Sequence, residues 1–218
     1  MPNTPLIGLI GKKRVGKDSF ASALTAHYDY QRVAFADPLK EASYFANPIM
    51  GTFSLMPEGH DHPVTQEWRL QEVIDTLGWD AAKDLIPEVR RFLEDLGTGG
   101  IRKLDEGFWL RIGLGRIDSF ATHGVPAVVT DARFPNEADA IRDRGGLIVR
   151  ILRDNPELDQ GGHVSNTALD DYAEDFTVPN DGTLADLQEA AIIVADQVAR
   201  ISARANSTRH RHGGLQHN

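Results

Sequence analysis

The chain has 218 residues, of which 41% are hydrophobic, so one large α/β domain with a sizeable core is expected. Its formal net charge of −9 argues against a polynucleotide as the main partner, because such binding depends on many Lys and Arg contacts to phosphates. The absence of cysteine excludes disulfides, thiolate metal sites and a cysteine nucleophile. Without a basic-then-apolar leader or an apolar run of about 18 residues, we expect a cytoplasmic protein with no membrane partner.

The first predicted elements are a strand, a loop and a helix near the N-terminus. Leu6–Ile10 is an apolar run typical of a buried strand, and a helix is predicted from Gly16 to about Ala26. The spacing of the glycines and lysine between them follows the P-loop pattern, in which backbone N–H groups converge on phosphate oxygens and the lysine reaches the outer phosphates. We therefore predict that a nucleoside triphosphate is bound by Gly11, Lys12, Lys13, Arg14, Val15, Gly16, Lys17, Asp18 and Ser19.

The position after Lys17 departs from the common P-loop pattern, which places Ser or Thr there to bind Mg²⁺. Asp18 occupies that position, and Ser19 follows it. A carboxylate also binds Mg²⁺, directly or through a water molecule, so both side chains are candidate magnesium ligands.

A second strand is predicted at Arg32–Ala36, followed by a helix that begins near Pro38. Asp37 is interpreted either as the N-cap of that helix or, together with Lys40, as a ligand-facing residue at the carboxyl end of a parallel strand. The two interpretations are compatible. Residues 47–63 are expected to be a loop, and apolar residues with a 3.6-residue period then predict packed helices over 65–77, 80–96 and 103–120.

Val125–Thr130 is a β-branched, apolar run that delivers Asp131 at its carboxyl end. An acid in that place provides the second magnesium-binding carboxylate of a P-loop protein. The alternative is a cap for a helix that begins near Pro135, and the upstream P-loop makes us favour the magnesium interpretation. Arg133 and Glu137 lie just beyond, on the same rim.

The last third of the chain continues the alternation of strands and helices. Strands are predicted at Leu147–Leu152 and Asp175–Val178, and a terminal helix at about 184–201. The polar segment 153–171, which begins with Arg153, is interpreted as a mobile lid or as a plain surface loop. Residues 204–218 are predicted to be disordered. The alternation predicts an α/β fold, a parallel sheet with helices on both faces.

Six short strings occur in an order that is informative as a set: Gly11–Ser19, Phe35–Lys40, Leu96–Thr98, Phe108–Trp109, Thr130–Glu137 and His163–Asp171. Together they resemble the phage-type deoxynucleoside monophosphate kinases, and the similarity runs from residue 6 to about residue 200. The resemblance implies a P-loop nucleoside monophosphate kinase-like domain over residues 1–203. Its helical substrate-binding insertion would cover about 37–121, and its lid about 153–171.

The family's activity is transfer of the γ-phosphoryl group of ATP, with Mg²⁺, to a 5′-deoxynucleoside monophosphate, which supplies DNA precursors. For a viral protein, the resemblance places this chain in the host cytoplasm, and it leaves a homodimer open. It assigns Asn180 to ATP binding and catalytic roles to Lys17, Asp37, Asp131 and Arg153. The substrate-binding residues that it implies are Asp37, Lys40, Arg90, Gly97, Thr98, Trp109, Asp131, Arg133 and Glu137. Trp109 is interpreted as a flat face for a base or, alternatively, as a core residue.

Other functions remain open at this point. Dephospho-coenzyme A kinase and phosphomevalonate kinase have a similar P-loop but phosphorylate a different acceptor. A P-loop switch that binds nucleotide without catalysis is the alternative from another class. A second, arginine-rich anion site argues against such a switch, and the acidic charge balance disfavours a polynucleotide kinase.

Overall fold

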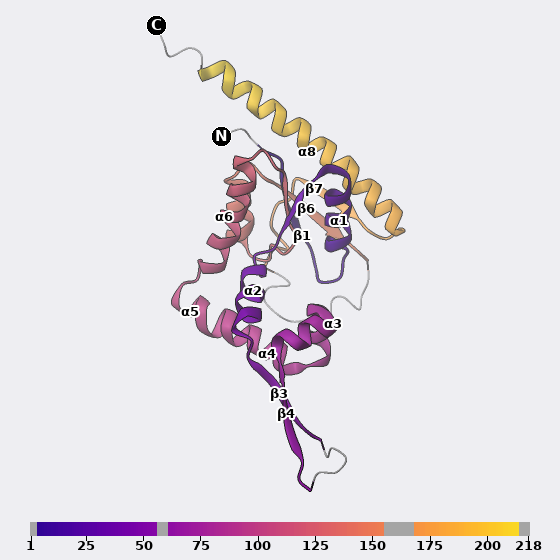
Figure 1. The fold of residues 1–218 in the computed structure, drawn as a ribbon. Coiled ribbons are helices and arrows are strands. Elements are labelled where there is room, and N and C mark those ends of the chain that lie inside the picture. Colours follow the sequence, from indigo (N-terminus) through magenta and orange to yellow (C-terminus); the bar gives the residue numbers. More distant parts are fainter. Residues whose placement is uncertain (1–3, 56–60, 155–167, 214–218) are drawn as a thin grey trace. The chain divides into compact units, whose positions relative to one another are not determined.

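The computed structural model describes residues 4–55, 61–154 and 168–213 (Figure 1). The chain divides into two compact units. The first consists of residues 1–35 and 113–218, and the second of residues 36–112.

The first unit is built on a five-stranded sheet with the order β2-β5-β1-β6-β7, in which neighbouring strands run parallel. Parallel strands need crossover connections, and helices supply most of them. The strands are β1 (Leu6–Ile10), β2 (Gln31–Val33), β5 (Ala127–Val129), β6 (Leu147–Leu152) and β7 (Phe176–Pro179). The helices are α1 (Lys17–Tyr28), the part of α6 (Phe108–Thr122) from Gly113 onward, α7 (Pro135–Arg142) and α8 (Leu184–Gly213).

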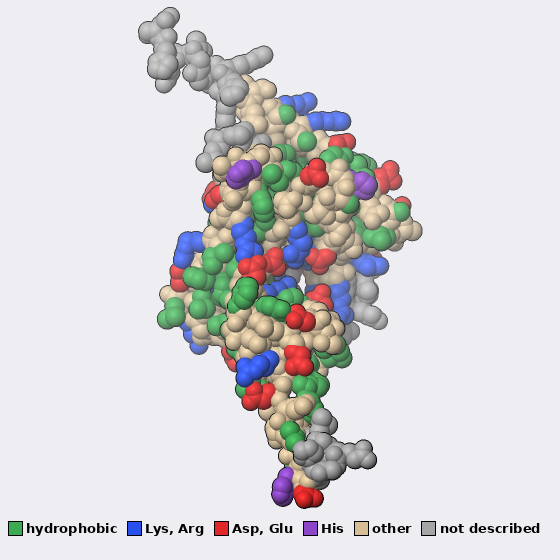
Figure 2. All heavy atoms as spheres, viewed as in Figure 1, with side chains coloured by type: hydrophobic (Ala, Val, Ile, Leu, Met, Phe, Trp, Pro, Cys, Tyr) green, Lys and Arg blue, Asp and Glu red, His purple; other side chains and the backbone are tan. Residues whose placement is uncertain are grey.

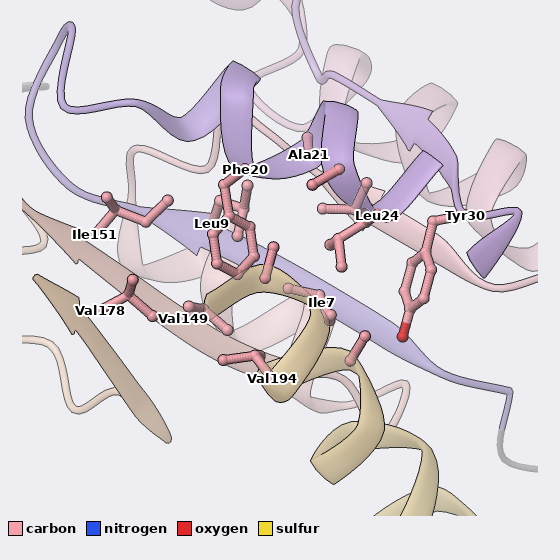
Figure 3. Packing of buried hydrophobic residues seen from close by; sticks show 14 of the residues in the cluster. Ile7, Leu9, Phe20, Ala21, Leu24, Tyr30, Val149, Ile151, Val178 and Val194 are labelled. Carbon is pink, nitrogen blue, oxygen red and sulfur yellow. The ribbon is translucent and has the colours of Figure 1, made fainter. Parts of the chain in front are cut away.

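Side chains alternate across β1 and so define the two faces of the sheet. Ile7 and Leu9 are fully buried in one cluster with residues of α1 and α8, such as Phe20 and Val194 (Figure 3). Gly8 faces the other side, where an added Cβ would come within 2.9 Å of the side chain of Ile141 in α7. Helices therefore cover both faces, and the predicted α/β fold with a parallel sheet is confirmed.

The second unit is mainly helical and carries a two-stranded antiparallel sheet. A small core forms around residues such as Met50, Leu70 and Val89, all of which are at least 95% buried. The elements are α2 (Asp37–Ala46), β3 (Ile49–Leu55), β4 (Val64–Arg69), α3 (Leu70–Leu85), α4 (Pro87–Glu94), the π-helix η1 (Asp95–Ile101), α5 (Arg102–Leu104) and the start of α6.

The antiparallel sheet corrects the sequence prediction of a loop at 47–63 followed by a helix from residue 65. Strands β3 and β4 pair over most of their length, and the rings of Phe53 and Trp68 meet edge to face at 5.5 Å. Val, Thr, Phe and Trp side chains favour strands, and this local preference outweighs the helical period assigned to the segment. The helix begins only at Leu70, because Arg69 still has extended backbone angles.

The helices after β4 also differ in their bounds from the prediction. The expected helix 80–96 is divided at Pro87, which cannot donate an N–H to a preceding turn and instead starts α4. The expected helix 103–120 begins at Phe108. The glycine-rich segment between them is the π-helix η1, a rare helix type that is frequent at functional sites.

The C-terminal helix also differs from expectation. Helix α8 continues to Gly213, into the segment 204–218 for which the sequence predicts disorder. Once a helix is nucleated on a packed face, each further residue adds one hydrogen bond, which favours continuation of the helix beyond its packed residues. Most of the predicted lid, residues 155–167, lies outside the described residues. Within the described part of the chain, no helix has the length and apolar character needed to cross a membrane.

Candidate active site

The loop between β1 and α1 adopts backbone angles that only particular residues tolerate. Gly11 and Gly16 have φ values of 128° and 105°, and Arg14 has a φ of 64°. A Cβ on Gly11 would come within 2.4 Å of the carbonyl oxygen of Ile151 at the end of β6. The glycines at both ends are therefore required by conformation and by space.

Lys17 closes this loop with its ammonium group. Nζ donates hydrogen bonds of 2.7 Å to the carbonyl oxygens of Gly11 and Lys12, so it lies within the curled backbone. Burial, together with the positive charge of Arg133, lowers the pKa of Lys17 from 10.5 to about 8. The charges of Asp18 and Asp131 act in the opposite direction. The predicted residues Lys17, Asp18, Asp131 and Arg133 thus form one electrostatic group.

Asp131 follows β5, which is the neighbour of β1 in the sheet. Because the carboxyl ends of parallel strands meet at one edge, the carboxylate lies on the same edge as the P-loop. Its Oδ1 accepts a 2.7 Å hydrogen bond from the backbone N–H of Phe35, just after β2. The sequence predicted that Asp131 lies at the P-loop edge of the sheet. It did not predict the hydrogen bond from Phe35.

Glu137 is placed differently from Arg133, although the two were assigned to the same rim. Its side chain is buried, and Oε2 accepts the N–H groups of Arg133 at 2.7 Å and Phe134 at 3.2 Å. It thereby caps the N-terminus of α7, whereas Arg133 is exposed. The sequence signal for this role was Pro135 at the first helical position with Glu two residues later, which is typical of a helix start.

Asn180 lies at the end of β7 and is also buried. Its Nδ2 donates to the carbonyl oxygen of Val15 at 2.8 Å, and its backbone N–H donates to Leu152 at 2.7 Å. The side chain therefore contacts the P-loop through the backbone of the loop. Arg153, predicted as a lid arginine, is exposed beyond the end of β6.

The sequence singled out no structural role for Arg150, which is one of the few buried charged residues. Its guanidinium donates to Glu174 at 2.9 Å and to the carbonyl oxygens of Leu169 and Tyr172 at 2.9 and 2.6 Å. These bonds join β6 to Leu169 near the end of the predicted lid and to residues just after it. A buried Arg needs several hydrogen-bond acceptors, so an Arg within an apolar strand was the sequence signal for this role.

In the second unit, four of the predicted substrate residues form two separate pairs. Lys40 Nζ lies 3.9 Å from Asp37 Oδ1 at the start of α2, where Ala36 and not Asp37 occupies the N-cap position. Trp109 is only 6% exposed, and its Nε1 donates to the carbonyl oxygen of Gly97 in η1 at 3.4 Å. This burial favours the core interpretation of Trp109, while Thr98 in the same π-helix is exposed.

Arg90 lies on the exposed side of α4 and donates to Asp84 at 3.2 Å. It lines a surface hollow of about 360 Å³, and the adjacent Arg91 lines the same hollow. The other lining residues are Lys83, Asp84, Pro87 and Glu94. Arg90 and the adjacent Arg91 therefore lie at the same hollow.

Magnesium is compatible with the carboxylates around the P-loop. No group of three or more metal-binding side chains occurs within residues 4–55, 61–154 and 168–213. Mg²⁺ in phosphate sites needs only one or two protein carboxylates, because substrate phosphates and water complete its shell. Asp18 and Asp131, which both act on the charge of Lys17, match that sparse set.

The face of the molecule in Figure 2 carries interspersed acidic and basic side chains.

Comparisons with known proteins give the family to which the chain belongs. Residues 50–191, well over half of the chain, match the family model described as deoxynucleotide monophosphate kinase. The deoxynucleotide monophosphate kinase of Enterobacteria phage T4 is 23% identical over 229 residues, covering 84% of this chain and 95% of the phage protein.

Two further relatives align with about half of the chain. The uncharacterized protein ORF77 of Ictalurid herpesvirus 1 is 35% identical over 108 residues, 47% of this chain and 46% of that protein. The deoxynucleotide monophosphate kinase of Escherichia phage RB69 is 28% identical over 101 residues, 45% of this chain and 41% of the relative. With a P-loop on a parallel α/β sheet and a family match over residues 50–191, the chain belongs to the deoxynucleotide monophosphate kinase family.

Proposed function

We propose that the chain transfers the γ-phosphoryl group of ATP to a 5′-deoxynucleoside monophosphate. The observation that carries the proposal is the P-loop ammonium of Lys17, which is seated between two backbone carbonyls and acted on by Asp18, Asp131 and Arg133. Membership of the kinase family supports the phosphotransfer class. The names of the phage relatives support a deoxynucleotide acceptor.

In the proposed reaction, an oxygen of the acceptor's 5′-phosphate attacks the γ-phosphorus of ATP. The bond between that phosphorus and the bridging β–γ oxygen breaks, and ADP leaves with the electron pair. Catalysis of this reaction depends on positioning and charge neutralisation, because the transition state spreads negative charge over the phosphoryl oxygens. The products are ADP and a deoxynucleoside diphosphate.

The residues of the first unit take the ATP side of this reaction. Backbone N–H groups of Gly11–Ser19 bind the phosphates, and Lys17 neutralises the β- and γ-phosphates. Asp18, Ser19 and Asp131 would bind Mg²⁺, which neutralises phosphate oxygens when present. Arg133 is proposed to bind the acceptor phosphate, and the exposed Arg153 to neutralise the moving phosphoryl group.

Residues of the second unit are proposed to bind the acceptor. Lys40 and Arg90 supply positive charge, and the exposed Thr98 supplies a hydroxyl on the π-helix. Asp37 is retained as a residue that orients the acceptor. Trp109 is proposed to act indirectly on acceptor binding, because its hydrogen bond to Gly97 supports the π-helix. Glu137 is proposed to act indirectly as well, because it accepts the backbone N–H of Arg133 and so holds that residue in place.

The experiment is a coupled ADP-release assay with ATP and Mg²⁺ against the deoxynucleoside and ribonucleoside monophosphates. We expect turnover on at least one deoxynucleotide and its loss in Lys17→Met. Lys103→Met, which replaces an exposed lysine of α5, is the matched control and retains activity. Dephospho-coenzyme A and phosphomevalonate are added to the panel, and turnover only on one of them would show a different acceptor. ATP binding without turnover on any acceptor would favour a switch.

A further inference from the structure

One buried amide joins the P-loop to the far end of the sheet. Asn180 is 8% exposed, and its Nδ2 donates to the carbonyl oxygen of Val15 over a separation of 165 residues in the sequence. The backbone N–H of the same residue donates to Leu152 on β6 at 2.7 Å. Asn180 is thus fixed at its backbone and bonded to the loop through its side chain.

The bonded carbonyl determines where the next N–H group points. A peptide unit is planar and trans, so its C=O and N–H bonds point in opposite directions. A hydrogen bond that fixes the carbonyl of Val15 therefore directs the N–H of Gly16 away from Asn180. In a P-loop, convergent N–H groups of this kind bind the phosphate oxygens.

The space around Gly16 shows that this contact is close. A Cβ on Gly16 would lie 2.5 Å from Nδ2 of Asn180 and 3.0 Å from the side chain of Leu187 in α8. The loop at Gly16 thus lies directly on Asn180. Gly16 also has a φ of 105°, a value that glycine adopts without strain and that residues with a Cβ rarely adopt.

We propose that Asn180 is a positioning residue for triphosphate binding and acts by orienting the peptide unit between Val15 and Gly16. The inference rests on the ATP-binding part of the proposed function. It differs from the role that the resemblance implies on the ATP side, because the residue acts through the loop backbone and does not recognise the nucleotide base. Its effect is therefore the same for any ligand that carries a triphosphate.

The test compares ATP with inorganic tripolyphosphate as ligands of the full-length protein, using calorimetry without an acceptor. Asn180→Leu keeps the branching of the side chain and removes the donor, and Asn180→Ala removes the same donor without adding volume or charge. We expect about 10-fold weaker binding of both ligands in both variants, the loss of roughly one hydrogen bond. Gln197→Leu, which replaces an exposed amide on α8, is the control and binds both ligands as the unsubstituted protein does.

Each outcome decides the inference. Unchanged affinity for both ligands in a folded variant, with only a lower melting temperature, would show a purely structural residue and overturn it. Weaker ATP binding with unchanged tripolyphosphate binding would indicate a base contact and overturn it as well, as would an unsubstituted protein that binds neither ligand. Failure of the unsubstituted protein to phosphorylate monophosphates while it binds ATP would overturn the proposed function and leave this inference intact.

Discussion

The backbone N–H of Phe35 donates a 2.7 Å hydrogen bond to Oδ1 of Asp131. This bond joins the residues that follow β2 and β5, which are neighbouring parallel strands. Asp131 therefore has two properties that mutation can separate: it accepts a backbone hydrogen bond, and it carries a negative charge that acts on Lys17.

Replacing Asp131 with Asn tests the charge alone. The amide oxygen still accepts from Phe35, so the free energy of unfolding changes by less than about 1 kcal/mol. Removal of the negative charge lowers kcat about 100-fold, because the variant loses an anionic ligand for the Mg²⁺ that would neutralise the reacting phosphates. Asp131→Ala has the same kinetic defect and also loses about 1–3 kcal/mol of stability. Chemical denaturation and steady-state kinetics measure the two effects, and an Asn variant with normal kcat would contradict the role of the charge.

Glu137 provides a test between capping and substrate contact. Glu137→Gln keeps an oxygen for the N–H groups of Arg133 and Phe134, so we expect near-normal stability and kcat/KM within a few-fold of the unsubstituted protein. Glu137→Ala leaves both donors without this acceptor and costs about 1–3 kcal/mol in unfolding free energy. A stable Gln variant with a strongly raised KM for the monophosphate would instead show that the carboxylate contacts substrate.

The lowered pKa of Lys17, about 8, makes ATP binding depend on pH. Below this value the ammonium is already protonated in the free protein. Above it the free amine is neutral, and the bound triphosphate raises the pKa, so binding takes up a proton and weakens as the pH rises.

Calorimetry at about pH 8.5, in two buffers with different ionisation heats, measures this proton uptake. Lys17→Met provides the control, because it has no titrating group at the position and should show none of this uptake. Equal binding enthalpies in the two buffers for the unsubstituted protein would contradict the prediction.

The P-loop edge of the sheet was predictable because the residues that define it lie close together in the sequence. Glycines, a lysine and an apolar strand lie within fifteen residues, and the strand before Asp131 delivers its acid by the same rule for parallel sheets. The roles of Glu137 and Asn180 were not predictable in the same way. Both side chains bond backbone groups, and backbone partners leave no residue signature in the sequence.

The second unit shows the other limit of prediction from sequence. Residues 65–77 were predicted to be one helix from their apolar period, yet residues 64–69 pair with β3 because strand-favouring residues on both segments match in register. That pairing connects two segments and cannot be derived from either alone. The π-helix at Asp95–Ile101 likewise depends on support from Trp109 and from Leu39, which lies against Gly97.

Tyr30 provides a test of the core that is independent of catalysis. Its side chain is 3% exposed, and among the described residues its hydroxyl has no hydrogen-bond partner. Burial of the phenol raises its pKa well above the usual range, because the charged form is disfavoured. An unpartnered buried hydroxyl destabilises the folded state, so Tyr30→Phe should raise the free energy of unfolding by about 1 kcal/mol.

The matched control for Tyr30→Phe is Tyr28→Phe. Tyr28 donates a 2.9 Å hydrogen bond to Asp196 from a more exposed position, so its loss should leave the protein unchanged or slightly less stable. Thermal unfolding followed by circular dichroism should show Tyr30→Phe melting roughly 2–4 °C higher than the unsubstituted protein. A lower melting temperature would mean that the hydroxyl has a partner, such as a buried water, whose bonds the phenylalanine removes.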